Sequence, residues 1–441
     1  MPRVAHRGAG PAYLQGIMPR HFSLALLSLT LAAPLAAQSA EIRDIQSDVR
    51  YLADDRLAGR KLGSPGADSA AEYLARRFQR LGLQPGPQGW FQAFTVDPTA
   101  PAAAHAGLAN GAAGRNVVAV LIGRDRRLRD EIIIVGAHYD HLGLGGFGSM
   151  APDSTGKVHN GADDNASGTA AILAIAKRLK DHRPARTIVF IAFTGEEEGL
   201  LGSTYYTKHP LYPMDRTIAM LNFDMVGRLR NDRLIVYGAG TALEWPRLLD
   251  SLNAGYHFDL KASGDGYGPS DHASFYAMRR PVLHFFTDLH EDYHRPTDDY
   301  PLISSEGIAR VANFAADVVG VIGDRVTPLT FVDLPPPQPA AGSSTTAVTP
   351  GYGAYLGSIP DMSESPGGVR IIGVRAGSPA ETAGLKGGDV IVRMGDVDVA
   401  DLQGMTSVLR SHRAGDTVDL VYVRDGQRIT TKVTFGVRGG S

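Results

Sequence analysis

The chain has 441 residues and contains no cysteine. Disulfide bonds are therefore excluded, and any metal site has to be built from histidine and carboxylate side chains. The sequence also lacks an excess of charge of either sign, since 44 Lys and Arg face 46 Asp and Glu. We therefore expect neither a nucleic acid nor a strongly anionic membrane surface as a partner. The length allows two or three domains of about 150 residues each.

A membrane-spanning run is also missing near the N-terminus. The apolar segment at 22–35 is too short for a span and lacks a flanking stop-transfer charge. Basic residues precede it and small residues follow it, which is typical of a secretory signal peptide. We expect residues 1–40 to be this signal, with Met18 as a candidate start and cleavage between Ala37 and Ala40. The protein would then be secreted or periplasmic, whereas an uncleaved membrane anchor is the alternative.

Hydrophobic periodicity divides the rest of the chain. Helical spacing over 42–52 and 71–81 is followed by a loop rich in Ala, Pro and Gly at 97–114. Strands and helices then alternate, which predicts an α/β domain at 41–326 with a mostly parallel, mixed sheet flanked by helices. The expected strands are 116–122, 131–137, 187–193, 218–223, 233–237 and 281–286, and the expected helices are 167–180, 244–252 and 305–322.

The C-terminal part has a different composition. A Pro-rich and then Ser/Thr-rich stretch at 327–350 predicts a solvated linker. Beyond it, residues 351–437 contain short apolar runs and one clear helical pattern near 402–411. We therefore expect a second, independent module of β-strands with helices.

Candidate metal ligands stand where apolar segments end. His138 directly follows the strand at 131–137, and ligands of open α/β sheets bind at the carboxyl ends of strands. Asp140, two residues further on, is placed to fix the tautomer of that imidazole. Asp224 ends the apolar run at 220–223, where an unpaired buried acid would be unfavourable and a metal removes the penalty. These positions predict a metal site at one edge of the sheet.

Other candidates lie in loops with clustered acids. Helix capping accounts for one acid in the run at 163–165 but not for all of them, so we interpret Asp164 as a carboxylate that bridges two metals. Gly195 allows the chain to turn before the glutamates at 196–198, which repel one another unless cations neutralise them. A solvated acidic loop is the alternative. His294 follows the last strand and supplies a second imidazole.

The chain resembles the co-catalytic di-zinc aminopeptidase family over residues 41–324. This family includes secreted bacterial leucine-type aminopeptidases, relatives of glutamate carboxypeptidase, and glutaminyl cyclases. The resemblance rests on five motifs taken together: GAHYDHLG (136–143), NGADDNASG (160–168), FTGEEEGLLGS (193–203), LNFDMVG (221–227) and EDYHRPTDD (291–299).

The resemblance implies two Zn²⁺ ions per chain with one shared carboxylate. It also implies that Glu196 is the general base and that Tyr293 donates a hydrogen bond to the oxyanion. The implied ligands are His138, Asp164 and Asp224 for one ion, and Glu197, His294 and the shared Asp164 for the other.

Several polar residues near the motifs receive other interpretations. Glu198 falls on a variable position and is assigned no role. In SDHASF at 270–275, we expect Asp271 and His272 to shape the pocket. Three histidines stand off the matched positions, and we expect them to support the site or the fold: His141, His159 and His290.

The function implied is that of a secreted, zinc-dependent exopeptidase. The most direct form is an aminopeptidase that hydrolyses N-terminal residues of peptides through a metal-bridging hydroxide and the base Glu196. Alternatives on the same fold are a glutaminyl cyclase-like acyltransferase and an enzyme with dipeptidase or carboxypeptidase specificity. A non-catalytic binding protein is a further alternative, against which the intact ligand set argues.

Residues 351–437 resemble a PDZ domain of the bacterial protease-associated kind. The resemblance rests on Tyr355-Leu356-Gly357, on GVRAGSPAETAGLKGGDVIVRMGD (373–396) and on the helix near 402–411. It implies that an extended peptide or protein C-terminus binds by strand addition. Ser358 stands where an apolar residue is more usual, so a structural or tethering role is the alternative.

Overall fold

A computed structural model gives the fold of the chain. It describes residues 39, 41–96, 111–146, 148–264, 266, 268–334, 354–360, 367–374, 377–399, 404–405, 408–409 and 412–436. The expected signal peptide (apart from residue 39), most of the loop at 97–114 and linker residues 335–350 lie outside this set. Within the described residues, no helix is both long and apolar enough to cross a bilayer.

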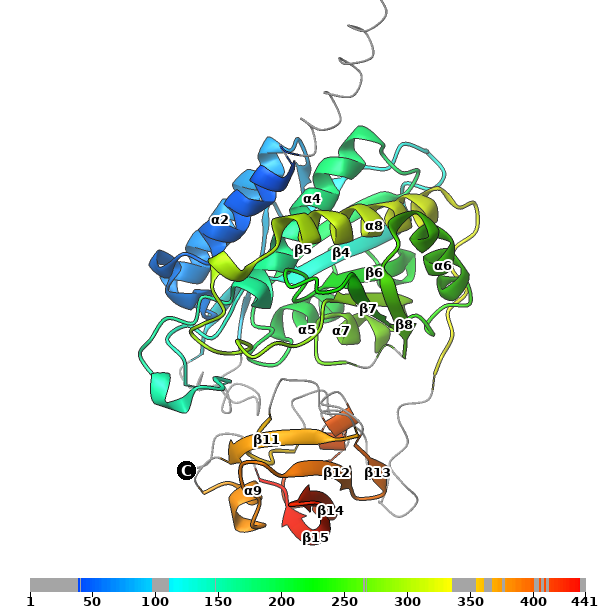
Figure 1. The fold of residues 1–441 in the computed structure, drawn as a ribbon. Helices are drawn as coiled ribbons and strands as arrows, with labels where there is room; N and C mark the ends of the chain where they lie inside the picture. Colours follow the sequence, from blue (N-terminus) through cyan, green and yellow to red (C-terminus); the bar gives the residue numbers. More distant parts are fainter. Residues whose placement is uncertain are drawn as a thin grey trace, which may run out of the picture.

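A mixed sheet forms the frame of the larger domain (Figure 1). In the described residues its strand order is β1-β3-β5-β4-β6-β9-β7-β8, with β2 paired to β3 outside this path. The central strands β5, β4, β6 and β9 run parallel, and antiparallel pairs flank them, which confirms the predicted α/β class. The bounds are β1 Gln84–Pro85, β2 Phe91–Thr95, β3 Ala113–Leu121, β4 Ile132–His138, β5 Thr187–Phe193, β6 Thr217–Phe223, β7 Arg233–Tyr237, β8 Asp259–Ser263 and β9 Val282–Phe286.

Helices cover both faces of this sheet (Figure 1). Side chains alternate along a strand, so Ile133 and Val135 of β4 face one core while Ile132 and Ile134 face the other. Burial on both faces explains why the central strands are continuous apolar runs. One core is covered by the helix at 41–52 with α2 Pro65–Arg80, α4 Gly168–Asp181, α6 Trp245–Tyr256 and α8 Ser305–Asp324, and the other by α5 Leu201–Lys208 and α7 His272–Tyr276.

The start of α8 is tied to the loop after β6. The Oγ atom of Ser304 accepts the N–H of Gly307 at 3.0 Å and caps the helix. The N–H of Ser304 donates to the carbonyl of Gly227 at 2.9 Å. Because Gly227 follows Asp224 by three residues, the helix helps to fix one of the predicted ligands.

The larger domain continues to make contacts beyond residue 326. Phe331 forms an isolated β-bridge with Ala242, and the N–H of Thr330 donates to a carboxylate oxygen of Glu244 at 2.9 Å. The guanidinium of Arg279 lies 5.2 Å from the centroid of the Phe331 ring. The first residues of the stretch expected as linker are therefore packed against the domain.

A second sheet forms the smaller domain, with the order β10-β11-β12-β14-β15 and β13 paired to β12. It has a core of its own, and the described residues 404–405 and 408–409 of the predicted helix are helical. The bounds are β10 Ser358–Pro360, β11 Val369–Val374, α9 Pro379–Thr382, β12 Val390–Met394, β13 Val397–Asp398, β14 Thr417–Arg424 and β15 Gln427–Thr434.

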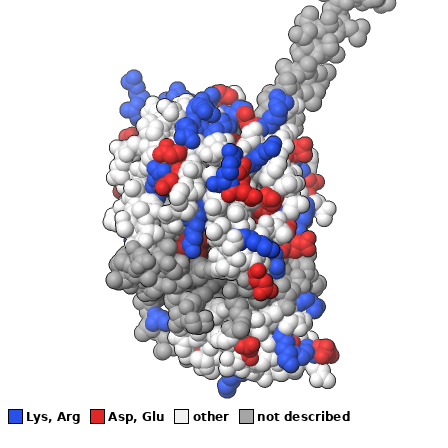
Figure 2. Space-filling model, turned by 90° about the vertical axis from the view of Figure 1, so that its left-hand side faces the viewer, with Lys and Arg blue, Asp and Glu red and all other residues white. Residues whose placement is uncertain are grey.

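Charged side chains of both signs are interspersed on the face drawn in Figure 2. This mixture fits the near balance of charges in the composition. No large area of one sign dominates among the described residues that this view displays.

Candidate metal centre

Candidate ligands meet at the carboxyl ends of the four parallel strands. His138 is the last residue of β4, and Asp224 directly follows β6. The glutamates at 196–198 come after β5, and His294 comes from the loop after β9. Asp164 lies in the turn that precedes α4. Parallel strands end at the same edge of a sheet, so the topology brings five distant segments together.

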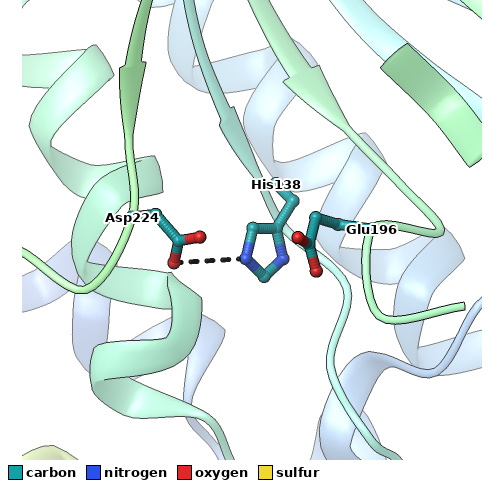
Figure 3. A group of neighbouring side chains, drawn as sticks. All are labelled: His138, Glu196 and Asp224. Atoms are coloured by element: carbon teal, nitrogen blue, oxygen red, sulfur yellow. Dashed lines mark hydrogen bonds and ion pairs between the residues drawn. The ribbon is translucent and has the colours of Figure 1, made fainter. Parts of the chain in front are cut away.

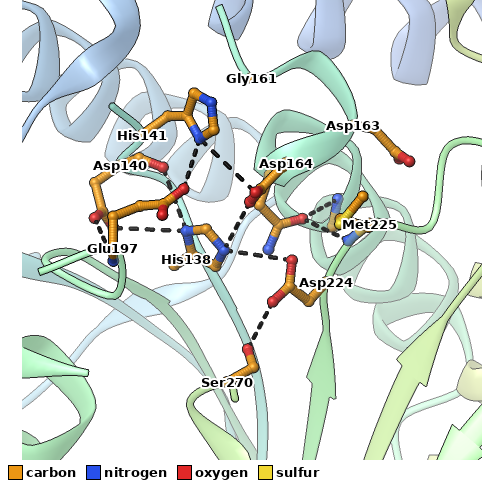
Figure 4. Close-up of polar contacts among 12 residues, drawn as sticks. His138, Asp140, His141, Gly161, Asp163, Asp164, Glu197, Asp224, Met225 and Ser270 are labelled. Carbon is orange, nitrogen blue, oxygen red and sulfur yellow. Dashed lines mark hydrogen bonds and ion pairs between the residues drawn. The ribbon is translucent and has the colours of Figure 1, made fainter. Parts of the chain in front are cut away.

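The side chains of four predicted ligands point toward a common centre (Figure 4): His138, Asp164, Glu197 and Asp224. His138 Nε2 lies 3.3 Å from Asp164 Oδ1 and 3.4 Å from Asp224 Oδ1. His294 Nε2 lies 3.1 Å from Asp164 Oδ2 and 3.2 Å from Glu197 Oε2. Asp164 thus presents one oxygen to each imidazole, which is the geometry that a bridging carboxylate needs.

Both imidazoles present the same nitrogen to the carboxylates. His294 Nδ1 lies 2.8 Å from the carbonyl of Gly148, so Nδ1–H donates and Nε2 keeps its lone pair in the neutral ring. His138 Nδ1 lies 3.3 Å from the carbonyl oxygen and 3.7 Å from a carboxylate oxygen of Asp140. Asp140 therefore stands beside the nitrogen that faces away from the cluster. Such contacts orient an imidazole that binds a metal through its other nitrogen.

The pKa shifts of residues in the cluster indicate that it attracts cations. Burial disfavours the charge of Glu197, but His294 and His141 outweigh it and lower the pKa of Glu197 to about 2. Burial also disfavours the imidazolium of His294, but Glu197 and Asp164 raise its pKa to about 10. Buried carboxylates thus attract protons to the histidines when no other cation is present. Imidazole and carboxylate donors around concentrated negative charge fit Zn²⁺.

Glu196 and Glu197 face different parts of the cluster. Donor atoms of Glu196, His138 and Asp224 all lie within 4.8 Å of one another, and Figure 3 shows Glu196 and Asp224 on either side of the imidazole. Gly195, with φ of 76°, turns the chain after β5 so that consecutive glutamates can point to the same site. Burial raises the pKa of Glu196 well above its ordinary value; His138 opposes this shift, while Glu197 and Asp224 add to it.

His141 contacts the cluster directly. Its Nδ1 lies 2.6 Å from Glu197 Oε1 and 3.9 Å from Asp164 Oδ2, and its ring is fully buried. The sequence predicts a supporting role for His141, and its donor atom also forms a group with those of Asp164 and Glu197, all within 4.8 Å of one another. His159, by contrast, makes contacts within its own loop, with Nε2 2.8 Å from the hydroxyl of Ser149.

The motifs of this site fall within a known sequence family. Residues 116–319 match the model of peptidase family M28. This match covers most of the larger domain, hereafter the M28 domain. Residues 352–435 match the PDZ domain model, and the smaller domain is a PDZ domain.

Curated relatives and solved structures resemble parts of the chain. A probable leucine aminopeptidase of Arthroderma otae is 33% identical over 153 residues, which are 33% of this chain and 40% of that protein. The serine protease Do-like HtrA of Lactococcus lactis is 49% identical over 67 residues, which are 15% of this chain and 16% of that protein. The chain thus spans less than half the length of the curated relatives that it matches.

One solved structure illustrates the shared fold of the M28 domain. It is an aminopeptidase from Aneurinibacillus sp. strain AM-1, with a TM-score of 0.51 and 18% sequence identity. The match covers 67% of this chain and 96% of that chain.

The segment at 290–298 contacts the turn of Asp163 and Asp164 at three places. His290 Nε2 lies 3.0 Å from Asp163 Oδ2, and His294 contacts Asp164 as described above. The carboxylate of Asp298 accepts the N–H groups of Asp163 at 2.9 Å and Asp164 at 3.0 Å. Asp163 itself points away from the cluster in Figure 4. Sequence analysis assigns no role to Asp298, because nothing in its pattern separates it from the half-buried Asp299 beside it.

The remaining predicted residues of the M28 domain lie around the cluster. The ring of Tyr293 stacks on that of His294, with centroids 3.8 Å apart. Asp271 and His272 are fully buried, and the ring of His272 stacks on His284 with centroids 4.5 Å apart. Burial raises the pKa of Asp271 to about 7, against the opposing effect of His138.

Proposed function

We propose that this protein is a zinc-dependent exopeptidase, and specifically an aminopeptidase that hydrolyses the N-terminal residues of peptides. One observation carries the proposal: predicted ligands from five segments converge on a buried cluster, with a carboxylate facing both imidazoles and a further glutamate beside it. The match to the model of peptidase family M28 and the similarity to a probable leucine aminopeptidase support it.

The cluster would hold two Zn²⁺ ions. His138 and Asp224 would serve one ion, Glu197 and His294 the other, and Asp164 both. Asp140 would hold the His138 ring in place by its contact with Nδ1 of that ring. His141 would orient Glu197 by its contact with the carboxylate. The support for this assignment is the donor set itself, which combines buried carboxylates with imidazoles that present Nε2.

Bound zinc would polarise the scissile carbonyl and lower the pKa of a bound water toward about 7. The protein supplies the proton transfer. The carboxylate of Glu196 accepts a proton from the attacking water and later donates it to the nitrogen of the leaving amine. Its burial beside His138 and Asp224 excludes bulk water from this transfer and keeps the proton at the site.

Tyr293 is proposed to donate its phenolic hydrogen to the oxygen of the substrate carbonyl. Stacking against His294 fixes the plane of the phenol ring next to the cluster. A fixed donor at the position where negative charge develops stabilises the transition state more than the ground state.

The exopeptidase preference would come from the acidic character of the site. A free α-ammonium group of the substrate is attracted by the surplus of carboxylates around Glu196 and Asp224, whereas an acetylated N-terminus is not. The substrate would then bind with its first peptide bond at the cluster.

The test combines metal analysis with product analysis on protein that lacks residues 1–37. Two zinc ions per chain and cleavage confined to peptides with a free N-terminus would support the proposal. Cyclisation of an N-terminal Gln by protein with one zinc would instead indicate a glutaminyl cyclase. Release of C-terminal residues would indicate a carboxypeptidase on the same fold.

The PDZ domain is proposed to bind the C-terminus of a peptide or protein substrate by strand addition. Its match to the PDZ family model supports this role. Deletion of residues 351–441 should then raise KM for long peptides and leave KM for short amide substrates unchanged. If the deletion leaves KM unchanged for long and for short substrates alike, the domain has a tethering or structural role.

We also propose that the protein is secreted or periplasmic. The support is the sequence pattern at 18–40, a basic start followed by an apolar segment and small residues. Mass spectrometry of the protein from the producing cells should find a mature N-terminus between Ala37 and Ala40. An intact N-terminus in the cytoplasmic fraction would contradict export.

A further inference from the structure

Arg60 is a fully buried arginine that contacts the loops of His138 and Asp164. Its guanidinium donates to four backbone carbonyls: Nε to Tyr139 at 2.6 Å, Nη1 to Asn160 at 2.6 Å and to Leu52, and Nη2 to Gly161 at 3.0 Å. No carboxylate of the described residues lies within ion-pair distance of it. A buried arginine that binds only carbonyls is unusual, because charged side chains are rarely buried without a charged partner.

Three of the four carbonyls that Arg60 binds belong to two ligand-bearing loops, and the fourth, that of Leu52, belongs to the helix at 41–52. Tyr139 directly follows His138, so a hydrogen bond to its carbonyl holds the backbone next to that imidazole. Asn160 and Gly161 open the turn that carries Asp164. One rigid, planar guanidinium therefore spans the backbones that present the first imidazole and the bridging carboxylate.

The turn that contains Arg60 has a strained backbone. Ala58, Gly59 and Arg60, at the end of a 3₁₀ segment at Asp55–Arg60, have φ values of 45°, 70° and 50°. A Cβ atom on Gly59 would lie 2.4 Å from the carbonyl oxygen of Gly143 and 2.5 Å from that of His159. Such strain persists only where surrounding contacts determine the conformation, and it is frequent near functional sites. The turn is thus packed directly against both ligand loops.

Arg60 also places a permanent charge near the cluster. Burial lowers the pKa of its guanidinium to about 10, which leaves it charged at neutral pH. Its electrostatic interactions with Asp140, Asp164 and Asp298 are the largest that oppose this shift. The positive charge therefore favours the ionised form of these carboxylates.

We propose that Arg60 is a positioning residue that sets the zinc affinity of the centre by fixing the loop of His138 relative to the loop of Asp164. The inference rests on the zinc centre of the proposed function. A lysine at this position keeps the charge but cannot span four carbonyls, because its ammonium is a single point donor. Loss of such supporting contacts typically weakens metal affinity by about 10- to 100-fold.

Arg186 provides the matched control. It is also fully buried, and it donates to the carbonyl of Ile322 at 3.1 Å and to Glu131 at 2.7 Å. It precedes β5 and so lies at the opposite end of that strand from the glutamates of the cluster. Loss of either buried arginine should lower the stability of the metal-free protein, but only Arg60 touches the ligand loops.

The experiment compares wild type, Arg60→Lys and Arg186→Lys as full chains without the signal segment. Zinc dissociation constants from chelator competition and the rise of Tm on zinc addition are the readouts. We expect Arg60→Lys to bind zinc about 10- to 100-fold more weakly than wild type. We expect Arg186→Lys to bind zinc as wild type does. At saturating zinc, Arg60→Lys should recover kcat, which a damaged catalytic group would not.

Three results would overturn the inference, and a fourth concerns the function. Equal zinc affinities of Arg60→Lys and wild type would remove Arg60 from the positioning role, as would equal losses in Arg60→Lys and Arg186→Lys. If Arg60→Lys does not fold, Asp55→Ala decides, because Asp55 accepts from the side chain of Asn160 at 2.7 Å and steadies the same turn. Wild-type zinc affinity in Asp55→Ala would then overturn the inference. Wild-type protein that binds no zinc would instead refute the proposed function.

Discussion

Glu196 and Glu197 are chemically identical neighbours whose surroundings shift their pKa values in opposite directions. Burial and adjacent carboxylates raise the pKa of Glu196, while contacts with His294 and His141 outweigh burial and lower the pKa of Glu197 to about 2. The first carboxylate therefore holds a proton readily and the second resists protonation. Under the proposed function, the environment of each glutamate, and not the residue type, would separate proton transfer from metal binding.

Replacement of Glu196 by Gln tests this division of roles. Glu196→Gln keeps the volume of the side chain but cannot accept a proton, so kcat should fall by about 10²- to 10⁴-fold. Zinc content should stay at the wild-type value, as measured by atomic absorption. Glu198→Gln, a buried neighbour with no assigned role, is the control and should keep most of its activity. A Glu196→Gln variant with near wild-type kcat would exclude Glu196 as the base.

The pKa of His294 predicts a pH dependence of zinc binding. Its value of about 10 in the metal-free protein means that zinc must displace a proton from the ring at neutral pH. Zinc affinity should therefore rise about tenfold per pH unit for each proton displaced, between about pH 6 and about pH 9. Calorimetry in buffers of different ionisation enthalpy measures the released protons. A constant affinity over this range would show that His294 is neutral before zinc binds.

The same shifts affect the stability of the metal-free protein. The raised pKa of His294 adds stability that is fully present below its ordinary value of 6.5 and is lost as the pH rises through about 10. The lowered pKa of Glu197 adds stability that is present above its ordinary value of 4.5 and is lost as the pH falls through about 2. Both effects describe one coupled pair and are not additive.

Individual residues differ in how far their sequence context predicts their place. His138 and Asp224 end apolar runs, so their positions at a strand end follow from the pattern. The contacts of His141, Asp298 and Arg60 depend on how loops fold back, and hydrophobic periodicity carries no information on that. Their partners are mainly backbone groups or side chains more than fifty residues away in the chain.

At the scale of elements, the segment that carries His294 also holds the turn of Asp164. Its residue Asp298 accepts the N–H groups of Asp163 and Asp164 with one buried carboxylate. A single segment thus carries one proposed ligand and fixes the backbone of the proposed bridging ligand. Under the proposed function, displacement of this segment would disturb both metal positions together.

Substitution of Asp298 tests that coupling. Asp298→Ala leaves two buried N–H groups without their acceptor, each of which costs about 1–3 kcal/mol of stability. Urea unfolding of the metal-free protein should show this loss, and zinc affinity should fall with it. Asp299→Ala is the control, because Asp299 only caps the N–H of Tyr300 at 2.7 Å and should cost about 1 kcal/mol with zinc affinity unchanged. Equal effects of the two substitutions would contradict the coupling.

The elements themselves follow the sequence where burial is complete. Strands β4, β5 and β6 are buried along their whole length, so their apolar runs predict them well. Strand β8 has the sequence DLKAS and lies at the edge of the sheet, where polar residues are tolerated and the apolar pattern is lost. Helices α5 and α7 are too short to show a helical period clearly.

At the scale of the whole molecule, the contacts of residues 327–334 define where the M28 domain ends. A truncated protein that ends at 334 retains the Phe331 bridge to Ala242 and the Thr330 contact with Glu244, whereas one that ends at 326 loses them. We expect the shorter form to have a lower Tm, because Phe331 packs against Tyr276 with ring centroids 5.7 Å apart. Differential scanning calorimetry of both forms measures the difference. Identical Tm values would place these residues in the linker.

The order of the cluster residues along the chain has a consequence for biosynthesis. Arg60 stands near the start of the domain, His138 lies well beyond it, and His294 and Asp298 come close to its end. Contacts between such distant positions form late, because long loops have to close first. A nascent chain that lacks the segment of His294 and Asp298 therefore has no complete cluster. If the protein is exported as proposed, its hydrolytic activity would arise only after the last part of the domain has crossed the membrane and folded.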